Sequence, residues 1–143
     1  METEPSRRQV LGGLGTAWIA SAAGTALGAE PDHSGHTMPN AALAAAAGAC
    51  VQAGEACVAH CLERFRAGDA SLGACATSVE QMLAVCHATQ RLALTGSPRL
   101  AALTAVCVEV CADCEKECRK HEQHPPCKAC ADACARFIAA AKA

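Results

Sequence analysis

Twelve cysteines recur at helical spacing between residues 50 and 134 of this 143-residue chain. Within four successive segments their separations are 7 and 4, then 11, then 4, 3 and 4, then 3 and 4 residues. Residues at these separations share one face of an α-helix, so the sequence predicts helices that each carry a stripe of sulfur. The cysteines are Cys50, Cys57 and Cys61, then Cys75 and Cys86, then Cys107, Cys111, Cys114 and Cys118, and finally Cys127, Cys130 and Cys134.

Glycine, proline and capping residues divide this region into four helices. Gly68 and Gly96 are typical of positions just after a helix, and Asn40 and Asp69 of N-caps. Two prolines follow His124 and open the last segment. We expect helices over about residues 40–67, 69–94, 98–121 and 126–140.

Connections this short make neighbouring helices antiparallel, which predicts an all-α, up-down-up-down four-helix bundle. Hydrophobic residues make up 52% of the chain but aromatic residues only 2%, so bulky side chains do not fill its core. Folding the stripes together predicts a Cys-lined core. We expect Cys50, Cys86, Cys107 and Cys134 at one end, Cys57, Met82, Cys111, Cys114 and Cys130 in the middle, and Cys61, Cys75, Cys118 and Cys127 at the other end.

The first 29 residues have the pattern of a twin-arginine signal peptide. Arg7 and Arg8 precede an uncharged, glycine- and alanine-rich run that ends in small residues before Glu30. The glycines argue against a transmembrane anchor at this place. We expect a signal at residues 1–29, a flexible linker at 30–39 and the bundle at 40–143. The mature protein would be periplasmic or otherwise exported and would not be bound to a membrane.

Charge argues against nucleic acid as a partner. The formal net charge is −2 and the isoelectric point is about 6.3, without a basic stripe or an aromatic platform.

The spacing of the cysteines favours metal binding over disulfides within a helix. Residues at i and i+4 have Cβ atoms roughly 5 to 6 Å apart, whereas a disulfide needs about 3.5 to 4.5 Å. A metal with bonds of about 2.3 Å to each sulfur bridges that gap. Disulfides between helices are still geometrically possible.

The softness of the ligands selects the metal. A lining of thiolates without carboxylates favours Cu(I) or Zn(II). Structural zinc needs closed sets of four ligands, whereas Cu(I) accepts two thiolates and so uses all twelve cysteines. Met82 completes the stripe between Cys75 and Cys86, either as a soft ligand or as core packing.

The chain resembles the bacterial copper storage proteins, especially their exported branch. The resemblance is carried by Cys57-Val58-Ala59-His60-Cys61, by Cys75, Met82 and Cys86, and by Cys107-x3-Cys111-x2-Cys114-x3-Cys118. It implies storage of many Cu(I) ions, a homotetramer and supply of copper to an acceptor enzyme. It also implies that His60 lies at the mouth of the bundle as a ligand, although a histidine beside such a stripe is more often a surface residue. Arg64, Ala67 and Leu72 stand where the resemblance leads us to expect methionines at that mouth.

Other functions are compatible with parts of this pattern. Cys111-x2-Cys114 and Cys127-x2-Cys130 could be thiol redox pairs, but the βαβ pattern of such enzymes is missing, so we expect no enzyme. The chain could also be a disulfide-stapled helical module, or a zinc or general metal-stress scavenger. His87, His121 and His124 lie near helix ends, where an imidazole is favourable for electrostatic reasons alone. In the linker, His33, His36 and Met38 could catch copper, or form a solvated tail.

Overall fold

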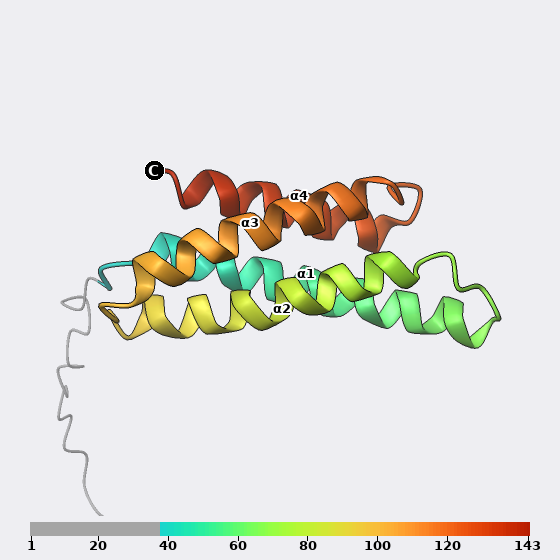
Figure 1. Ribbon diagram of the computed structural model, residues 1–143, viewed down its shortest axis with the longest axis horizontal. Helices are drawn as coiled ribbons and strands as arrows, with labels where there is room; N and C mark the ends of the chain where they lie inside the picture. Colours follow the sequence, from blue (N-terminus) through green and yellow to red (C-terminus); the bar gives the residue numbers. More distant parts are fainter. Residues whose placement is uncertain (1–37) are drawn as a thin grey trace, which may run out of the picture. The chain divides into compact units, whose positions relative to one another are not determined.

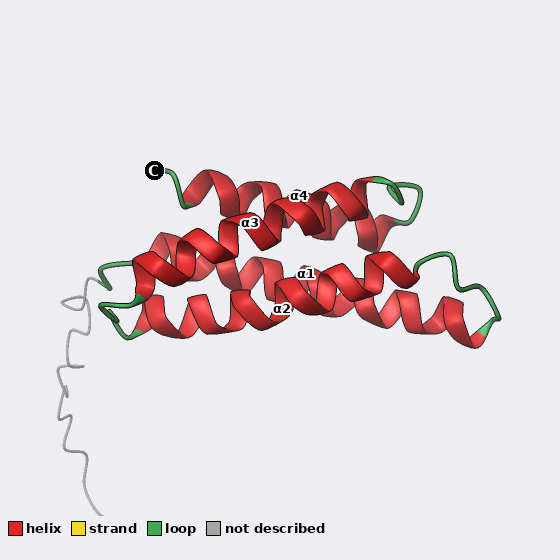
Figure 2. Cartoon of the chain, in the orientation of Figure 1, coloured by secondary structure: helices red, strands yellow, loops and turns green. Residues whose placement is uncertain are grey.

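The computed structural model describes residues 38–143, which form four antiparallel α-helices joined by short turns (Figure 1). The helices are α1 (Ala41–Arg66), α2 (Gly73–Leu94), α3 (Leu100–Arg119) and α4 (Pro125–Ala140). This stretch contains no strand (Figure 2). The predicted all-α bundle is therefore confirmed. The signal peptide and most of the linker lie outside the described residues and stay predictions.

The helices close into a ring in which each contacts its two neighbours. Helix α1 lies against α2 and α4, and α3 lies against the same two helices. The start of α1 and the end of α4 lie at one end of the bundle, together with the turn between α2 and α3 (Figure 1). The other two turns lie at the opposite end. We call these the α2–α3 end and the α1–α2 end.

Glycine ends the first two helices as expected. Gly68 and Gly96 have positive φ angles of 82° and 62°. The residue after each glycine donates its N–H back into the helix: Asp69 to the Arg64 carbonyl at 3.0 Å, and Ser97 to the Leu92 carbonyl at 3.0 Å. This left-handed turn satisfies the last carbonyls of a helix and is favourable for glycine, which lacks a Cβ.

Two helix starts differ from the predictions. Helix α2 begins at Gly73 and not after Asp69, because the Asp69 carboxylate accepts the Ser71 N–H at 3.0 Å and binds Arg64 at 2.6 Å. These bonds fold residues 69–72 into a separate turn. Helix α3 begins at Leu100, two residues after Pro98, and its backbone N–H donates to Ser97 across that turn.

By length and composition α1 also resembles a membrane span, with an 18-residue window of mean hydropathy 1.4. Only 28% of that window is buried inside the bundle. Its buried residues include Cys50, Cys57 and Cys61, and it lies against α2 and α4.

Gly54 fills a gap in the cysteine stripe of α1. It lies four residues after Cys50 and three before Cys57, and it is buried. A Cβ at this position would be 2.7 Å from the Met82 methyl group and 2.8 Å from a Leu83 methyl group. The Met82 side chain therefore occupies the space that a side chain at residue 54 would need.

We expect Gly54→Val to destabilise the bundle by about 1 to 3 kcal/mol because it overpacks a full core. Thermal unfolding followed by circular dichroism measures the loss. Gly73→Ala is the control, because a Cβ at Gly73 has nothing within 4 Å. Combining Gly54→Val with Met82→Ala should cost less than the sum of the two single changes. Additive losses would contradict the contact between residues 54 and 82.

Candidate metal centre

All twelve cysteines point into the bundle and are fully buried. Each is a free thiol. They form one cluster with Met82 and a few apolar side chains, including Val79, Leu72 and Phe137. The predicted Cys-lined core is present, and sulfur takes the place that large aliphatic and aromatic side chains hold in most bundles.

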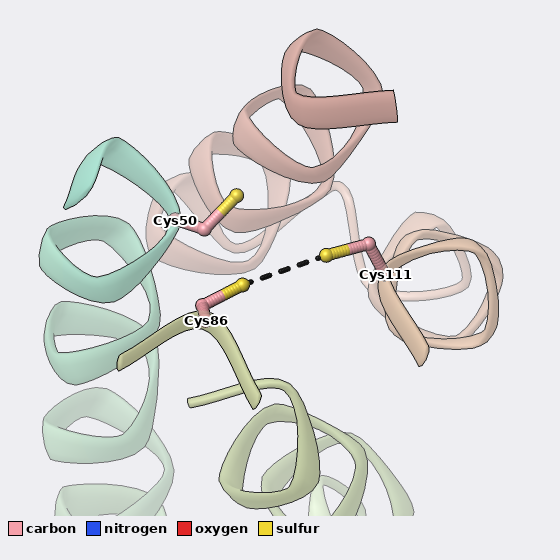
Figure 3. Close-up of side chains that lie close together, drawn as sticks. All are labelled: Cys50, Cys86 and Cys111. Atoms are coloured by element: carbon pink, nitrogen blue, oxygen red, sulfur yellow. Dashed lines mark hydrogen bonds between the residues drawn. The ribbon is translucent and has the colours of Figure 1, made fainter. Parts of the chain in front are cut away.

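Near the α2–α3 end, three helices bring their sulfurs together (Figure 3). The Cys86 Sγ lies 3.5 Å from the Cys107 Sγ and 3.6 Å from the Cys111 Sγ. Cys50, Cys86 and Cys111 have all three sulfurs within 4.8 Å of one another. Beyond this group the core continues with Ala47, Thr89 and Phe137. These side chains do not bind soft metals, so the column of sulfurs ends here.

Near the α1–α2 end, sulfurs from all four helices meet. The Cys75 Sγ lies 3.5 Å from that of Cys118 and 3.9 Å from those of Cys57 and Cys127. The Cys57 and Cys127 sulfurs are 3.7 Å apart. Cys61 joins Cys57 and Cys75 in a second group within 4.8 Å. This is the densest part of the column.

Between the two ends, α3 and α4 supply the sulfurs. The Cys114 Sγ lies 3.9 Å from the Cys130 Sγ, and Cys134 completes a third group with them. A fourth group, Cys57, Cys118 and Cys130, joins this middle part to the α1–α2 end. The opposite wall of the column is formed by Gly54 and Met82, which contact each other.

The three predicted levels are confirmed in part. Cys50, Cys86 and Cys107 lie together at the α2–α3 end as expected, but Cys111, expected in the middle, contacts Cys86 there. Cys134, expected at that end, contacts Cys50 and Cys111 but also groups with Cys114 and Cys130 in the middle. Side chains on a helix lean toward its N-terminus, which moves both sulfurs in these directions. Cys57, also expected in the middle, contacts the sulfurs of the α1–α2 end.

The distances between neighbouring sulfurs suit a shared metal ion. They run from 3.5 to 4.0 Å, beyond the roughly 2.05 Å of a disulfide bond. Two bonds of about 2.3 Å span up to about 4.6 Å when they are in line, and about 4.0 Å in a trigonal arrangement. The thiols can therefore hold soft ions in two- or three-coordinate sites without large backbone movement.

The outermost thiols near the α1–α2 end keep their protons at neutral pH. Burial, followed by the negative charge on Cys57, raises the pKa of Cys61 to about 11 and that of Cys127 to about 12. Burial disfavours the charged thiolate in both cases. A cation that replaces these protons removes that penalty.

In the middle of the column, hydrogen bonds divide the protons unequally. Hydrogen bonds from Cys118, Cys130 and Cys134 hold the pKa of Cys114 well below its usual range. The same contacts raise the pKa of Cys130 well above its usual range, because it is held as a donor to Cys114 and Cys118. Neighbouring sulfurs in the column therefore differ in how readily they lose their protons, with Cys114 favoured as the hydrogen-bond acceptor and Cys130 as the donor.

Each candidate metal group in residues 38–143 consists of cysteine alone. The carboxylates near α3 and α4 are held in surface ion pairs: Arg119 binds Glu115, Glu122 and Asp132 at 3.2, 2.8 and 2.7 Å. Lys128 binds Asp132 as well, at 2.8 Å. These pairs tie α3 to α4 outside the column and leave its interior to soft ligands.

Met82 and His60, the two predicted ligands other than cysteine, take different positions. Met82 is fully buried beside the column. His60 lies half-buried next to Cys61, and its Nε2 is 3.0 Å from the Nδ1 of His124. We expected His124 only as a histidine at a helix end, so the sequence did not reveal this pairing. The sequence feature that could have indicated a role for His124 is its position three residues before Cys127.

The resemblance to the exported copper storage proteins leads us to expect methionines at three positions near the mouth of the bundle. This chain has other residues at all three. Arg64 is paired with Asp69, Ala67 caps the end of α1, and Leu72 is fully buried in the core. The α1–α2 end is therefore covered by an apolar side chain and a salt bridge where thioethers were expected.

The fold and the site together define a class of protein: a four-helix bundle whose core is built from metal-ligating side chains. A family model described as copper storage protein matches residues 36–143. The chain is also 32% identical over 84 residues to an uncharacterized cysteine-rich protein, YhjQ, of Bacillus subtilis (strain 168). That match covers 59% of this chain and 75% of the relative. The chain belongs to the copper storage protein family.

We expect the apparent affinity of the column for a soft metal ion such as Cu(I) to fall as the pH falls, because a bound ion replaces thiol protons. Below the raised pKa values of Cys61 and Cys127, each proton released lowers the affinity about tenfold per pH unit. Competition with a Cu(I) chelator that does not titrate between pH 6 and about pH 8 measures this slope. Cys61→Ala should make the slope shallower, and a slope of zero in the parent protein would contradict the assignment of protons.

Proposed function

We propose that this protein stores Cu(I) as thiolate complexes along the axis of the bundle. The observation that carries the proposal is the continuity of twelve buried sulfurs, whose candidate groups contain no other ligand type. Soft thiolates favour Cu(I), and two or three of them complete its coordination. Copper is here the cargo of the protein and not a cofactor.

The sharing of sulfurs between groups favours Cu(I) over structural zinc. Cys57 belongs to two candidate groups, and so does Cys130. Structural zinc prefers closed, separate sets of four ligands. A network of overlapping groups suits an ion with fewer ligands per site, and we expect roughly one Cu(I) per thiol or slightly fewer.

Storage in this proposal is an equilibrium property and not catalysis. Copper displaces protons from buried thiols, and its charge neutralises the resulting thiolates. The CxxC pairs lie within α3 and α4 and are fully buried, whereas redox-active cysteines are partly exposed. We therefore propose no enzymatic activity.

We also propose export, assembly and delivery. The leader at residues 1–29 supports export through the twin-arginine pathway, which carries folded proteins and would protect the thiols from oxidation. Large apolar side chains on the surface support a homo-oligomer, a tetramer by family resemblance. They are Leu62, Leu94 and Val106, which are 45%, 42% and 48% exposed. Delivery to a copper enzyme is the use that we propose for the stored metal.

An anaerobic Cu(I) titration of the purified chain, with a count of reactive thiols after denaturation, tests storage. We expect all twelve thiols to react and on the order of ten Cu(I) ions to bind each chain, near one per thiol. Few reactive thiols and little copper uptake would instead identify a disulfide-stapled module. Tight binding of a few Zn(II) ions in preference to Cu(I) would identify a zinc protein.

A double variant locates the metal. Cys111→Ala with Cys114→Ala should lower the number of bound Cu(I) ions, because it removes sulfurs from two candidate groups. Val79→Ala is the matched control, since Val79 is equally buried in the same cluster but is not a ligand. Unchanged stoichiometry in the double variant would contradict storage at the α2–α3 end and in the middle of the column, where these two sulfurs lie.

Export is tested by replacing both Arg7 and Arg8 with Lys. A reporter that is active only after twin-arginine transport should lose its activity when fused to the changed leader, because paired arginines define that signal. Export that persists in the variant would contradict this route. The oligomeric state follows separately from light scattering of the purified protein.

A further inference from the structure

A leucine in a turn closes the α1–α2 end of the thiol column. The chain crosses this end twice, between Cys61 and Cys75 and between Cys118 and Cys127 (Figure 1). Within these two stretches Leu72 is the only fully buried residue. It belongs to the same core cluster as the four cysteines, whereas the two residues before it are exposed. Leu72 is therefore the buried side chain that separates this end of the column from the surface.

The opposite end of the column is closed by helices. Beyond its sulfurs lie two layers of buried side chains, and all of them belong to helices: Ala47, Thr89 and Phe137, then Ala44, Ala93 and Leu100. Leu72 lies instead at the boundary where α2 begins, in the turn at residues 69–72. Turns open at a lower free energy than helices that pack in a core. The α1–α2 end is therefore the end that opens first.

One ion pair holds this turn against α1. The Asp69 carboxylate accepts two hydrogen bonds from the Arg64 guanidinium, at 2.6 and 3.1 Å, and one from the Ser71 N–H at 3.0 Å. The side chains of Arg64 and Asp69 are 44% and 32% exposed, so solvent weakens their attraction. The pair can break while the four helices stay packed. We call the pair of Arg64 and Asp69 the latch.

We propose that Leu72 is a gate for the thiol column and that the latch holds it shut. When the latch breaks, residues 69–72 move away from α1 and Leu72 leaves the core, which exposes the sulfurs of Cys61, Cys75 and Cys127. A Cu(I) ion finds no ligand at Leu72, and an ion without ligands is costly to place among apolar groups. Copper therefore passes while the turn is open. As a gate for copper, Leu72 rests on the storage proposed above.

Labelling of the thiols in the metal-free protein tests the gate without copper. A short pulse of iodoacetamide under anaerobic conditions, followed by peptide mass spectrometry, gives a reaction rate for each cysteine. Asp69→Asn should raise the rates of the three exposed thiols by about two- to fivefold, the effect of losing an exposed ion pair. Cys86 and Cys107 should keep their parent rates, because an open turn at the α1–α2 end does not reach them.

A second latch variant excludes a direct effect of charge. Asp69→Asn removes a negative charge near the three thiols, which by itself lowers their pKa and speeds labelling. Arg64→Gln removes a positive charge, which by itself raises their pKa and slows labelling. The gate predicts faster labelling in both variants.

Two further variants test the gate residue and its specificity. Leu72→Ala shortens the gate side chain while the latch stays intact, and it should speed labelling of the same three thiols. Lys128→Gln is the matched control, because it breaks another surface ion pair near this end, the 2.8 Å contact with Asp132. It should raise none of the rates.

The outcomes separate the gate from storage. Unchanged rates in Arg64→Gln or in Leu72→Ala, or a rise shared by all twelve cysteines in both latch variants, would overturn the gate. Release of Cu(I) from the filled protein to excess chelator should become faster by the same factor in the latch variants, with the same number of ions bound. Unchanged release would overturn the gate as the path of copper. A chain that shows the labelling pattern but binds no Cu(I) would contradict storage and support the gate.

Discussion

The structure depends on the burial of twelve thiols along one axis. The side chains that form the core of the bundle are therefore also its candidate metal ligands. A four-helix bundle usually excludes water with leucine, isoleucine and aromatic side chains. Here the fully buried cluster consists mainly of cysteine, with Phe137, Leu72 and Met82 as its largest members. A thiol is small and weakly polar, so it packs as an apolar group when empty and becomes a strong ligand when it loses its proton.

Rigid helices hold the sulfurs of the column close together. Two glycine-terminated helix ends and three short turns fix the register of the bundle, and the ion pairs of Arg119 hold α3 to α4. Sulfurs from different helices then lie 3.5 to 3.9 Å apart without a covalent bond between them. Metal binding needs small changes in side-chain rotamers, so the cost in conformational entropy has largely been met by folding.

Protons and metal ions compete for the same sites. Burial favours the neutral thiol at Cys61 and Cys127, while hydrogen bonds favour the thiolate at Cys114. The surface carboxylates take no part, because they are paired with arginine and lysine outside the column. At the α1–α2 end the imidazoles of His60 and His124 bind each other by a hydrogen bond of 3.0 Å.

The amino-acid sequence by itself determined the four helices, the face that each presents to the core and the burial of all twelve cysteines. These properties follow from a local periodicity of 3.6 residues and from local signals such as Gly68 and Gly96. Only the tertiary structure decided which sulfurs meet. The level of Cys111 and Cys134 depends on the lean of each side chain and on the stagger of neighbouring helices, which spacing along one helix does not encode. The contact of Gly54 with Met82 and the pairing of His60 with His124 join residues 28 and 64 positions apart, so they exist only after the helices have packed.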